Sequence, residues 1–399
     1  MVKKAVFFIF FITVAAVAAF LIFGEKLKNP VIGTEDFSGV TVSSEEENPV
    51  LPVESESAGE ITLSAEKLAI PPEKVKAIYA TAWSAGSASK VDYLLRVIKE
   101  TGINAIVIDI KDFSGYIAYR TNDPEIAKYK TESPKIKDVD ALIAKLHAEN
   151  VYVIARVVVF QDPVLAIARP DLAVKDSKTG EIWVDNKKLA WMDPSSKEVW
   201  DYNIAIAKNA FAKGFDEVNF DYVRFPSDGA LSEMSFPFYN GIKTKREAIK
   251  DFFVYLREAL KGEVISADLF GLVTSASDDM GIGQYLEDAY GNFDFICPMV
   301  YPSHFASGFI GYKNPAAFPY EVVKYSGESA EKRIQALVPE GELPETKLRP
   351  WLQDFNLGYE YGEDQVRAQI KAVEDTSDAG WMMWDPKNNY DQKEGFKGI

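Results

Sequence analysis

Residues 214–226, GFDEVNFDYVRFP, place a carboxylate directly after a predicted strand. Val218 and Phe220 are typical core-strand residues, and Asp221 follows them at once. The proline at position 226 ends the strand region, because proline cannot donate to the next rung of a sheet. Enzymes with α/β barrels carry their chemistry at the carboxyl ends of parallel strands. We therefore interpret Asp221 as a candidate catalytic group; the alternative is a simple ion pair with Arg224 at a barrel rim.

A second carboxylate, Asp268, lies at the end of the next predicted strand, residues 264–271. Hydrolysis of a glycosidic bond needs one protonated carboxyl group, which donates to the leaving oxygen, and one ionised group, which attacks the anomeric carbon or activates water. The apolar neighbours of Asp268 should raise its pKa, which suits the acid. Tyr222 and Arg224 should help to keep Asp221 ionised as nucleophile or base. The alternative for Asp268 is a helix N-cap.

Polar and aromatic side chains end the other predicted strands, and in a barrel they converge on one rim. Sugar rings stack on aromatic faces, and their hydroxyl groups need donors and acceptors. Trp183 and Trp191 are either further sugar platforms or core residues of the long insertion 161–195. The candidate substrate-binding residues are Asp109, Lys111, Asp112, Arg156, Tyr222, Arg224, Tyr301, His304, Gln353, Asp354, Trp384 and Asp385.

The elements that must position these residues alternate between strands and helices, which is the signature of a parallel sheet. Eight βα units predict an α/β fold, a (β/α)₈ TIM barrel with enlarged βα loops. An open doubly wound sheet is the alternative, but no glycine-rich phosphate turn follows the first strand. Helices are predicted over 89–101, 138–149, 197–213 and 246–260. Strands are predicted over 76–83, 104–112, 152–160, the segment before Asp221, 264–271, 292–301, 348–355 and 380–386.

The first 72 residues differ from the rest in composition. Lys3 and Lys4 precede an apolar run at 5–23, long enough to span a bilayer, for which about 20 residues are required. We predict a signal-anchor over 1–26 with the lysines in the cytoplasm; a cleaved signal peptide is the alternative. Residues 27–72 are rich in Glu, Ser and Pro and predict a disordered acidic linker. The barrel is assigned to 73–399.

Charge and composition exclude several classes of protein. The formal charge of −16 argues against a nucleic-acid partner, because phosphate binding needs clustered Lys and Arg. One cysteine, Cys297, excludes an internal disulfide, and two histidines disfavour a histidine-based triad. The acidic residues at 278–279 and 287–288 are interpreted as a solvated loop rather than a cation site. The sequence therefore predicts no metal and no cofactor, and chemistry carried by carboxylates, aromatics and amides.

Several motifs together resemble the putative glycosyl hydrolase domain family of TIM barrels. They are 108–112 (IDIKD), 220–226 (FDYVRFP), 267–271 (ADLFG) and 298–304 (PMVYPSH), and 191–194 (WMDP) is similar to a related bacterial glycosyl-hydrolase-like family. The resemblance covers about residues 75–391. It implies an extracytoplasmic carbohydrate-active barrel with Asp221 and Asp268 as the best catalytic candidates. It also implies that Asp109, Lys111, Tyr301 and His304 line the site.

The sequence thus predicts a glycoside hydrolase that acts on a polysaccharide or oligosaccharide. The apolar segment predicts a single-pass cell-membrane protein with an extracytoplasmic barrel, secreted if the segment is cleaved. The alternative function is a catalytically inactive carbohydrate-binding or envelope-scaffolding barrel, since a fold does not secure a function. A lyase or transglycosylase that uses the same cleft is a third interpretation.

Overall fold

Eight parallel strand positions close into a barrel in the computed structural model, which describes residues 66–339, 342 and 345–398. The sheet closes because β11 pairs with both β1 and β10, while β10 also contacts β8. All these pairings are parallel, so the carboxyl ends of the strands meet at one rim. In order around the barrel, the strands are β1 (Val75–Ala80), β2 (Ala105–Lys111), β3 (Tyr152–Val158), β5 (Glu217–Asp221), β7 (Ile265–Phe270), β8 (Phe295–Met299), the divided strand β9 (Lys347–Leu348) and β10 (Trp351–Gln353), and β11 (Gly380–Trp384).

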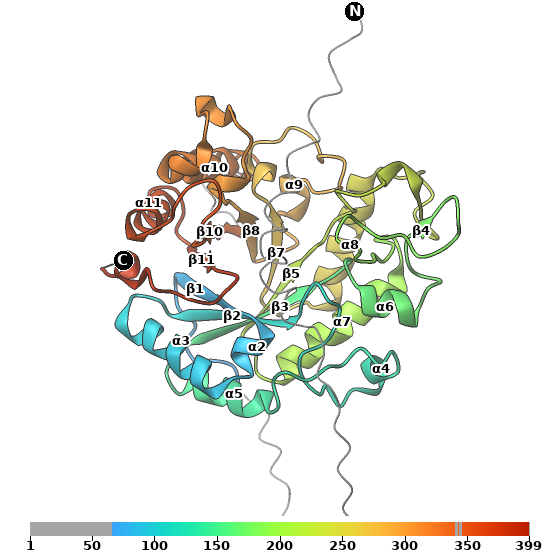
Figure 1. Ribbon diagram of the computed structural model, residues 1–399, viewed down its shortest axis with the longest axis horizontal. Helices are drawn as coiled ribbons and strands as arrows, with labels where there is room; N and C mark the ends of the chain where they lie inside the picture. The colour runs from blue at the N-terminus through green and yellow to red at the C-terminus, as the bar shows by residue number, and fades with distance from the viewer. Residues whose placement is uncertain (1–65, 340–341, 343–344, 399) are drawn as a thin grey trace, which may run out of the picture. The chain divides into compact units, whose positions relative to one another are not determined.

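Helices surround the strands (Figure 1). Each long helix buries one apolar stripe against the barrel, as helical spacing requires. In α3, for example, Val91, Leu94, Leu95 and Ile98 are buried. The longer helices are α3 (Ala88–Glu100), α5 (Val139–His147), α7 (Lys197–Ala212), α8 (Lys245–Ala259), α10 (Pro319–Gln335) and α11 (Glu363–Glu374); the shorter ones are α2 (Ala82–Ala85), α4 (Pro124–Ala127), α6 (Pro163–Ala168) and α9 (Leu286–Ala289). Two short antiparallel strands, β4 (Lys175–Asp176) and β6 (Met234–Ser235), pair within the enlarged loops.

The inside of the barrel carries charge at two levels. Side chains alternate along each strand, so Ala77, Val107 and Ile154 point into the barrel and form one apolar cluster. The residues that follow them, Ile78, Ile108 and Ala155, point outward and belong to the core under the helices. At the lower level, Glu217 pairs with Arg349, and both side chains are fully buried. The upper level, toward the carboxyl rim, holds the carboxylates discussed below.

The predicted (β/α)₈ barrel is confirmed, with differences at strand ends. The first strand stops at Ala80 rather than at residue 83, because the Thr81 side chain accepts from the Ser84 N–H and starts α2. The seventh strand is interrupted between β9 and β10, where Pro350 has no N–H to donate. Trp83 consequently lies on a short helix at the rim.

The predicted anchor, 1–26, lies outside the described residues, as does the linker up to residue 65. None of the helices in the described part of the chain has the length and hydropathy needed to cross a bilayer. The last linker residues already contact the barrel. Lys67 pairs with Glu263, and the Leu68 N–H donates to Asp216 Oδ1 over 2.6 Å.

Candidate active site

Adjacent strands bring three aspartates and one arginine together inside the carboxyl end of the barrel. Asp109 of β2 is in register with Arg156 of β3, and Arg156 is in register with Asn219 of β5. Asp221 follows Asn219 by two residues and therefore points inward as well. Asp268 comes from the neighbouring strand β7. All four charged side chains are buried.

Arg156 is the hub of this cluster. Its Nη1 lies 2.5 Å from Asp109 Oδ1, its Nη2 contacts Asp221 Oδ2, and its Nε lies 3.5 Å from Asp268 Oδ2. The guanidinium also lies over the Trp384 ring, 5.1 Å from its centroid. One positive charge cannot balance three buried carboxylates, so the cluster favours protonation of at least one of them.

Among the three carboxyl groups around Arg156, Asp268 is the one whose surroundings most favour the protonated form. Burial, followed by the charge of Asp221, raises the pKa of Asp268 to about 8, although Arg156 opposes the shift. Asn219 Nδ2 and Trp351 Nε1 both donate to its Oδ1, over 2.9 and 2.7 Å. Because two donors point at Oδ1, the proton of the neutral acid belongs on Oδ2.

Asp221 has the contacts of a charged carboxylate. Besides Arg156, the backbone N–H of Tyr222 donates to its Oδ1 over 2.5 Å. Tyr222 adopts a φ of +54°, a left-handed conformation that is uncommon for a non-glycine residue and that turns the chain away from the strand. Arg224 does not pair with Asp221 and instead donates to Phe225 O and Ser227 Oγ over 3.1 and 3.2 Å. The cation predicted from the adjacent sequence is therefore supplied by Arg156 of the neighbouring strand β3.

Asp109 is held between two donors. The Tyr79 hydroxyl of β1 donates to its Oδ2, and Arg156 binds its Oδ1. Burial raises the pKa of Asp109, with Arg156 opposing the shift. The Trp384 ring stacks on Tyr79 with centroids 3.9 Å apart. Trp384 is only half-buried, so it forms the aromatic edge of the cluster.

Lys111 lies away from this cluster. The pairing of β2 with β3 shifts register between Asp109 and Lys111, and this bulge turns the lysine outward. Its ammonium is buried, 2.8 Å from Asp162 Oδ2 and 2.5 Å from Val158 O. Asp112 stays at the rim, where its Oδ1 accepts from the Ser114 N–H over 2.9 Å.

The last strands place the other predicted residues in different roles. Gln353 is fully buried. Its Oε1 accepts a hydrogen bond from the Ser303 N–H, and its Nε2 donates to Phe355 O. Asp354 is buried with Oδ2 lacking a hydrogen-bond partner, and burial and Asp385 raise its pKa to about 8. Asp385 accepts from the Lys387 and Asn389 N–H groups and so holds the final loop.

Tyr301 and His304 follow β8 at the rim. Tyr301 is buried beside the carboxylates, whose charges, after burial itself, raise its pKa. His304 is exposed and lies edge-on to Tyr301, with ring centroids 5.3 Å apart. Trp183 and Trp191 are both buried. They are therefore core residues of the insertion and not platforms for a sugar.

Sequence reasoning missed two residues of the cluster, Tyr79 and Asn219. The signal available for Asn219 was its position two residues before Asp221, which puts both side chains on one face of the strand. The Tyr79 side chain also points into the barrel, but the end of the first strand had to be known to recognise it. Within the described residues, no group of His, Cys, Asp and Glu side chains is arranged to hold a metal ion.

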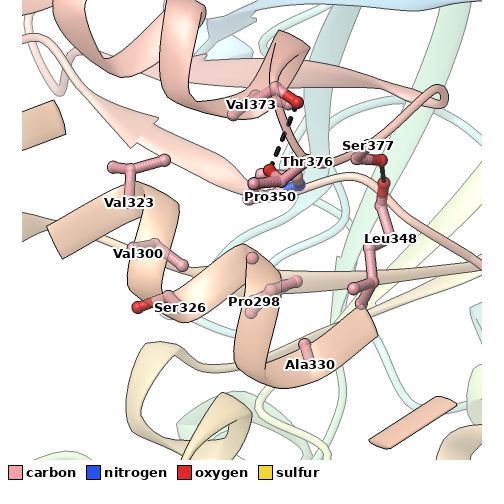
Figure 2. Close-up of a pocket in the computed structure, with 11 residues that line it drawn as sticks. Pro298, Val300, Val323, Ser326, Ala330, Leu348, Pro350, Val373, Thr376 and Ser377 are labelled. Atoms are coloured by element: carbon pink, nitrogen blue, oxygen red, sulfur yellow. Dashed lines mark hydrogen bonds between the residues drawn. The ribbon is translucent and has the colours of Figure 1, made fainter. Parts of the chain in front are cut away.

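A separate cavity lies outside the barrel wall (Figure 2). It is lined mainly by apolar residues of α10, the end of α11 and the strands β8 to β10, and Ser326 Oγ there lacks a hydrogen-bond partner. Its water-accessible volume of about 10 Å³ has room for one water molecule at most. It is a packing defect rather than a substrate site.

The structure is thus a closed (β/α)₈ barrel with carboxylates and aromatic rings at its carboxyl rim. The chain belongs to the family described as "Putative glycosyl hydrolase domain", whose sequence profile matches residues 77–390. The predicted resemblance is therefore confirmed. A comparison with curated proteins finds no match.

Two solved structures of low sequence identity share the fold. The PgaB (BpsB) glycoside hydrolase domain from Bordetella bronchiseptica is 14% identical over 82% of this chain and 100% of that one, with a TM-score of 0.56. The chitobiase of Flavobacterium johnsoniae is 9% identical over 81% of this chain and 47% of its own, with a TM-score of 0.50. A hypothetical protein from Ruminiclostridium thermocellum ATCC 27405 is 41% identical over 51% of this chain and 98% of its own, with a TM-score of 0.45.

Proposed function

We propose that the barrel is a glycoside hydrolase in which Asp268 is the general acid and Asp221 the nucleophile or base. The observation that carries this proposal is the contrast between two carboxyl groups on adjacent strands. Asp221 binds a guanidinium and a backbone N–H. Asp268 is buried with a pKa of about 8 and is therefore neutral at pH 7. A glycosidase needs this division between an ionised and a protonated carboxyl group.

In this proposal each group has its own step. Asp268 donates the proton on Oδ2 to the glycosidic oxygen as the bond from that oxygen to the anomeric carbon breaks. Asp221 either bonds to the anomeric carbon or takes a proton from the water that does so. Asn219 and Trp351 fix the Asp268 carboxyl through Oδ1, so that the protonated oxygen keeps one direction. Trp384 packs against Tyr79 and Arg156 and so helps to hold the guanidinium that contacts both carboxyl groups.

The test measures reducing ends released from envelope and plant polysaccharides. Because the acid must be protonated, we expect kcat/KM to fall as pH rises through about 8. Asp268→Asn should lower turnover by roughly 10²- to 10⁴-fold. The variant should also lose the fall in kcat/KM at alkaline pH, because asparagine does not titrate. An aryl glycoside with a good leaving group needs less proton donation, so Asp268→Asn should lower its turnover less than that of a polysaccharide.

Two results would count against this assignment. Undiminished turnover by Asp268→Asn would remove Asp268 from the mechanism. Binding of a polysaccharide by the wild type without any release of reducing ends would instead indicate a carbohydrate-binding barrel.

We also propose that the apolar segment at 5–23 anchors the protein in the cell membrane with the barrel outside the cytoplasm. Its support is the length of the segment and the two lysines before it. We expect the full chain to stay with membranes after a carbonate wash, and protease added to intact cells to cut residues 27–65. Recovery of the barrel in the cytoplasmic fraction, protected from protease, would contradict this prediction.

A further inference from the structure

Two exposed aromatic rings lie on the same rim as the carboxylates. Trp83 is 70% exposed, and it is the one exposed ring among the chain's seven tryptophans, all of which lie in the described residues. Tyr116 is 43% exposed. Trp83 belongs to α2, which follows β1, and Tyr116 to the loop that follows β2. Both therefore come from the carboxyl ends of barrel strands.

A lysine lies between these rings. Lys135 Nζ is 5.1 Å from the Trp83 ring centroid and 5.6 Å from that of Tyr116. The ammonium donates to Ser133 O and Oγ, and no carboxylate in the described part of the chain pairs with it. In a protein with a formal charge of −16, this is an uncompensated positive charge framed by two exposed aromatic faces.

The backbone holds this arrangement in place. The Lys135 N–H donates to Ala118 O over 2.7 Å, which fixes its strand-like segment to the loop that carries Tyr116. The end of α2 rests on the Lys135 carbonyl: a Cβ atom on Gly86 would lie only 2.1 Å from that oxygen. Because Gly86 has no side chain, the end of α2 can pack closely against the Lys135 backbone, and Trp83 of α2 lies next to the Lys135 ammonium.

We propose that Trp83, Tyr116 and Lys135 form a subsite for an acidic sugar residue of a polysaccharide. The rings would stack on the C–H faces of the sugar, and the ammonium would bind its carboxylate as a charge-assisted hydrogen bond. Nucleic acid is a poorer match, because its phosphate backbone needs clustered Lys and Arg and this subsite offers one ammonium. The proposal rests on the proposed hydrolase function and specifies its substrate as a polyuronate or another acid-bearing polymer.

A short stretch of chain joins one side of the subsite to the candidate active site. Residues 109–116 run from the central Asp109 to Tyr116, and the turn between them is fixed by the Ser114 N–H bonded to Asp112 Oδ1. Gly115 packs against Asp162, where any Cβ would lie 2.2 Å from Oδ1.

The test measures binding by the full-length chain in detergent, carrying Asp221→Asn so that no polymer is cut. The probes are polygalacturonate, alginate and hyaluronan, each paired with its carbodiimide-reduced form, in which the carboxyl groups have become alcohols. We expect at least one polyuronate to bind about tenfold more tightly than its reduced form, a preference that weakens with salt. Lys135→Gln should abolish the preference, while Trp83→Ala should weaken binding of both forms about tenfold.

Lys137→Gln is the matched control, because Lys137 is exposed two residues further along the chain and should leave the preference intact. Equal affinity for the charged and reduced forms of all three polymers would overturn the proposal, as would a preference that survives Lys135→Gln in a folded variant. The two proposals fail separately: release of reducing ends by the wild type tests hydrolysis, whereas binding by Asp221→Asn tests the subsite.

Discussion

Replacing Asp221 by asparagine is expected to lower kcat/KM for the polysaccharide on the order of 10⁴-fold, the scale seen when one member of a catalytic set is removed. The amide has nearly the same shape as the carboxylate but can neither attack the anomeric carbon nor accept a proton from water. Because Arg156 keeps its contacts with Asp109 and Asp268, the variant should fold. The measurement is reducing-end release together with the melting temperature.

Asp288→Asn provides a matched control for this substitution. Asp288 is equally buried and pairs with Arg246, but it lies on α9, outside the barrel interior. Its replacement should lower the melting temperature and leave turnover per folded molecule unchanged. A folded Asp221→Asn variant with wild-type turnover would move the catalytic pair elsewhere on the rim.

Replacing Arg156 by methionine is expected to destabilise the protein by about 3–5 kcal/mol at neutral pH, the range found when one partner of a buried ion pair is removed. The substitution leaves Asp109, Asp221 and Asp268 buried without a cation. Urea unfolding measures the loss, and the exposed pair of Lys145 with Asp92 supplies the control. Lys145→Met should change the midpoint far less, because exposed pairs contribute little.

The instability of Arg156→Met should depend on pH in a defined direction. Arg156 lowers the pKa of Asp109 and of Asp268, so its removal raises both values further above about 4, the value in the unfolded chain. The folded variant then holds protons that the unfolded chain releases. Its stability should therefore be highest near pH 4 and fall as pH rises toward and through the folded pKa values. A loss independent of pH would show that packing, rather than charge, explains the effect.

The strands, the barrel and the inward position of Asp221 and Asp268 could be predicted because periodicity and strand-end chemistry are local properties. The partner of Asp221 could not, because Arg224 is near in sequence while Arg156 is near in space, one strand away. Lys111 was assigned to the site because it lies at the end of the second predicted strand, and its position two residues after Asp109 agrees with that assignment. A bulge, which leaves no clear mark in the sequence, reverses that parity.

The buried pair of Glu217 and Arg349 has a consequence for how the barrel assembles. The two residues lie 132 positions apart, so the strands that carry Glu217 and its hydrogen-bonding neighbours Tyr152 and Ser266 are synthesised long before the arginine. Until the seventh strand docks, any barrel-like intermediate contains a buried carboxylate without its cation, which is costly. Partly closed barrels are thereby disfavoured, and the last strands must join in one cooperative step with the first. Fragments that end before Arg349 should consequently stay unfolded instead of forming a stable half-barrel.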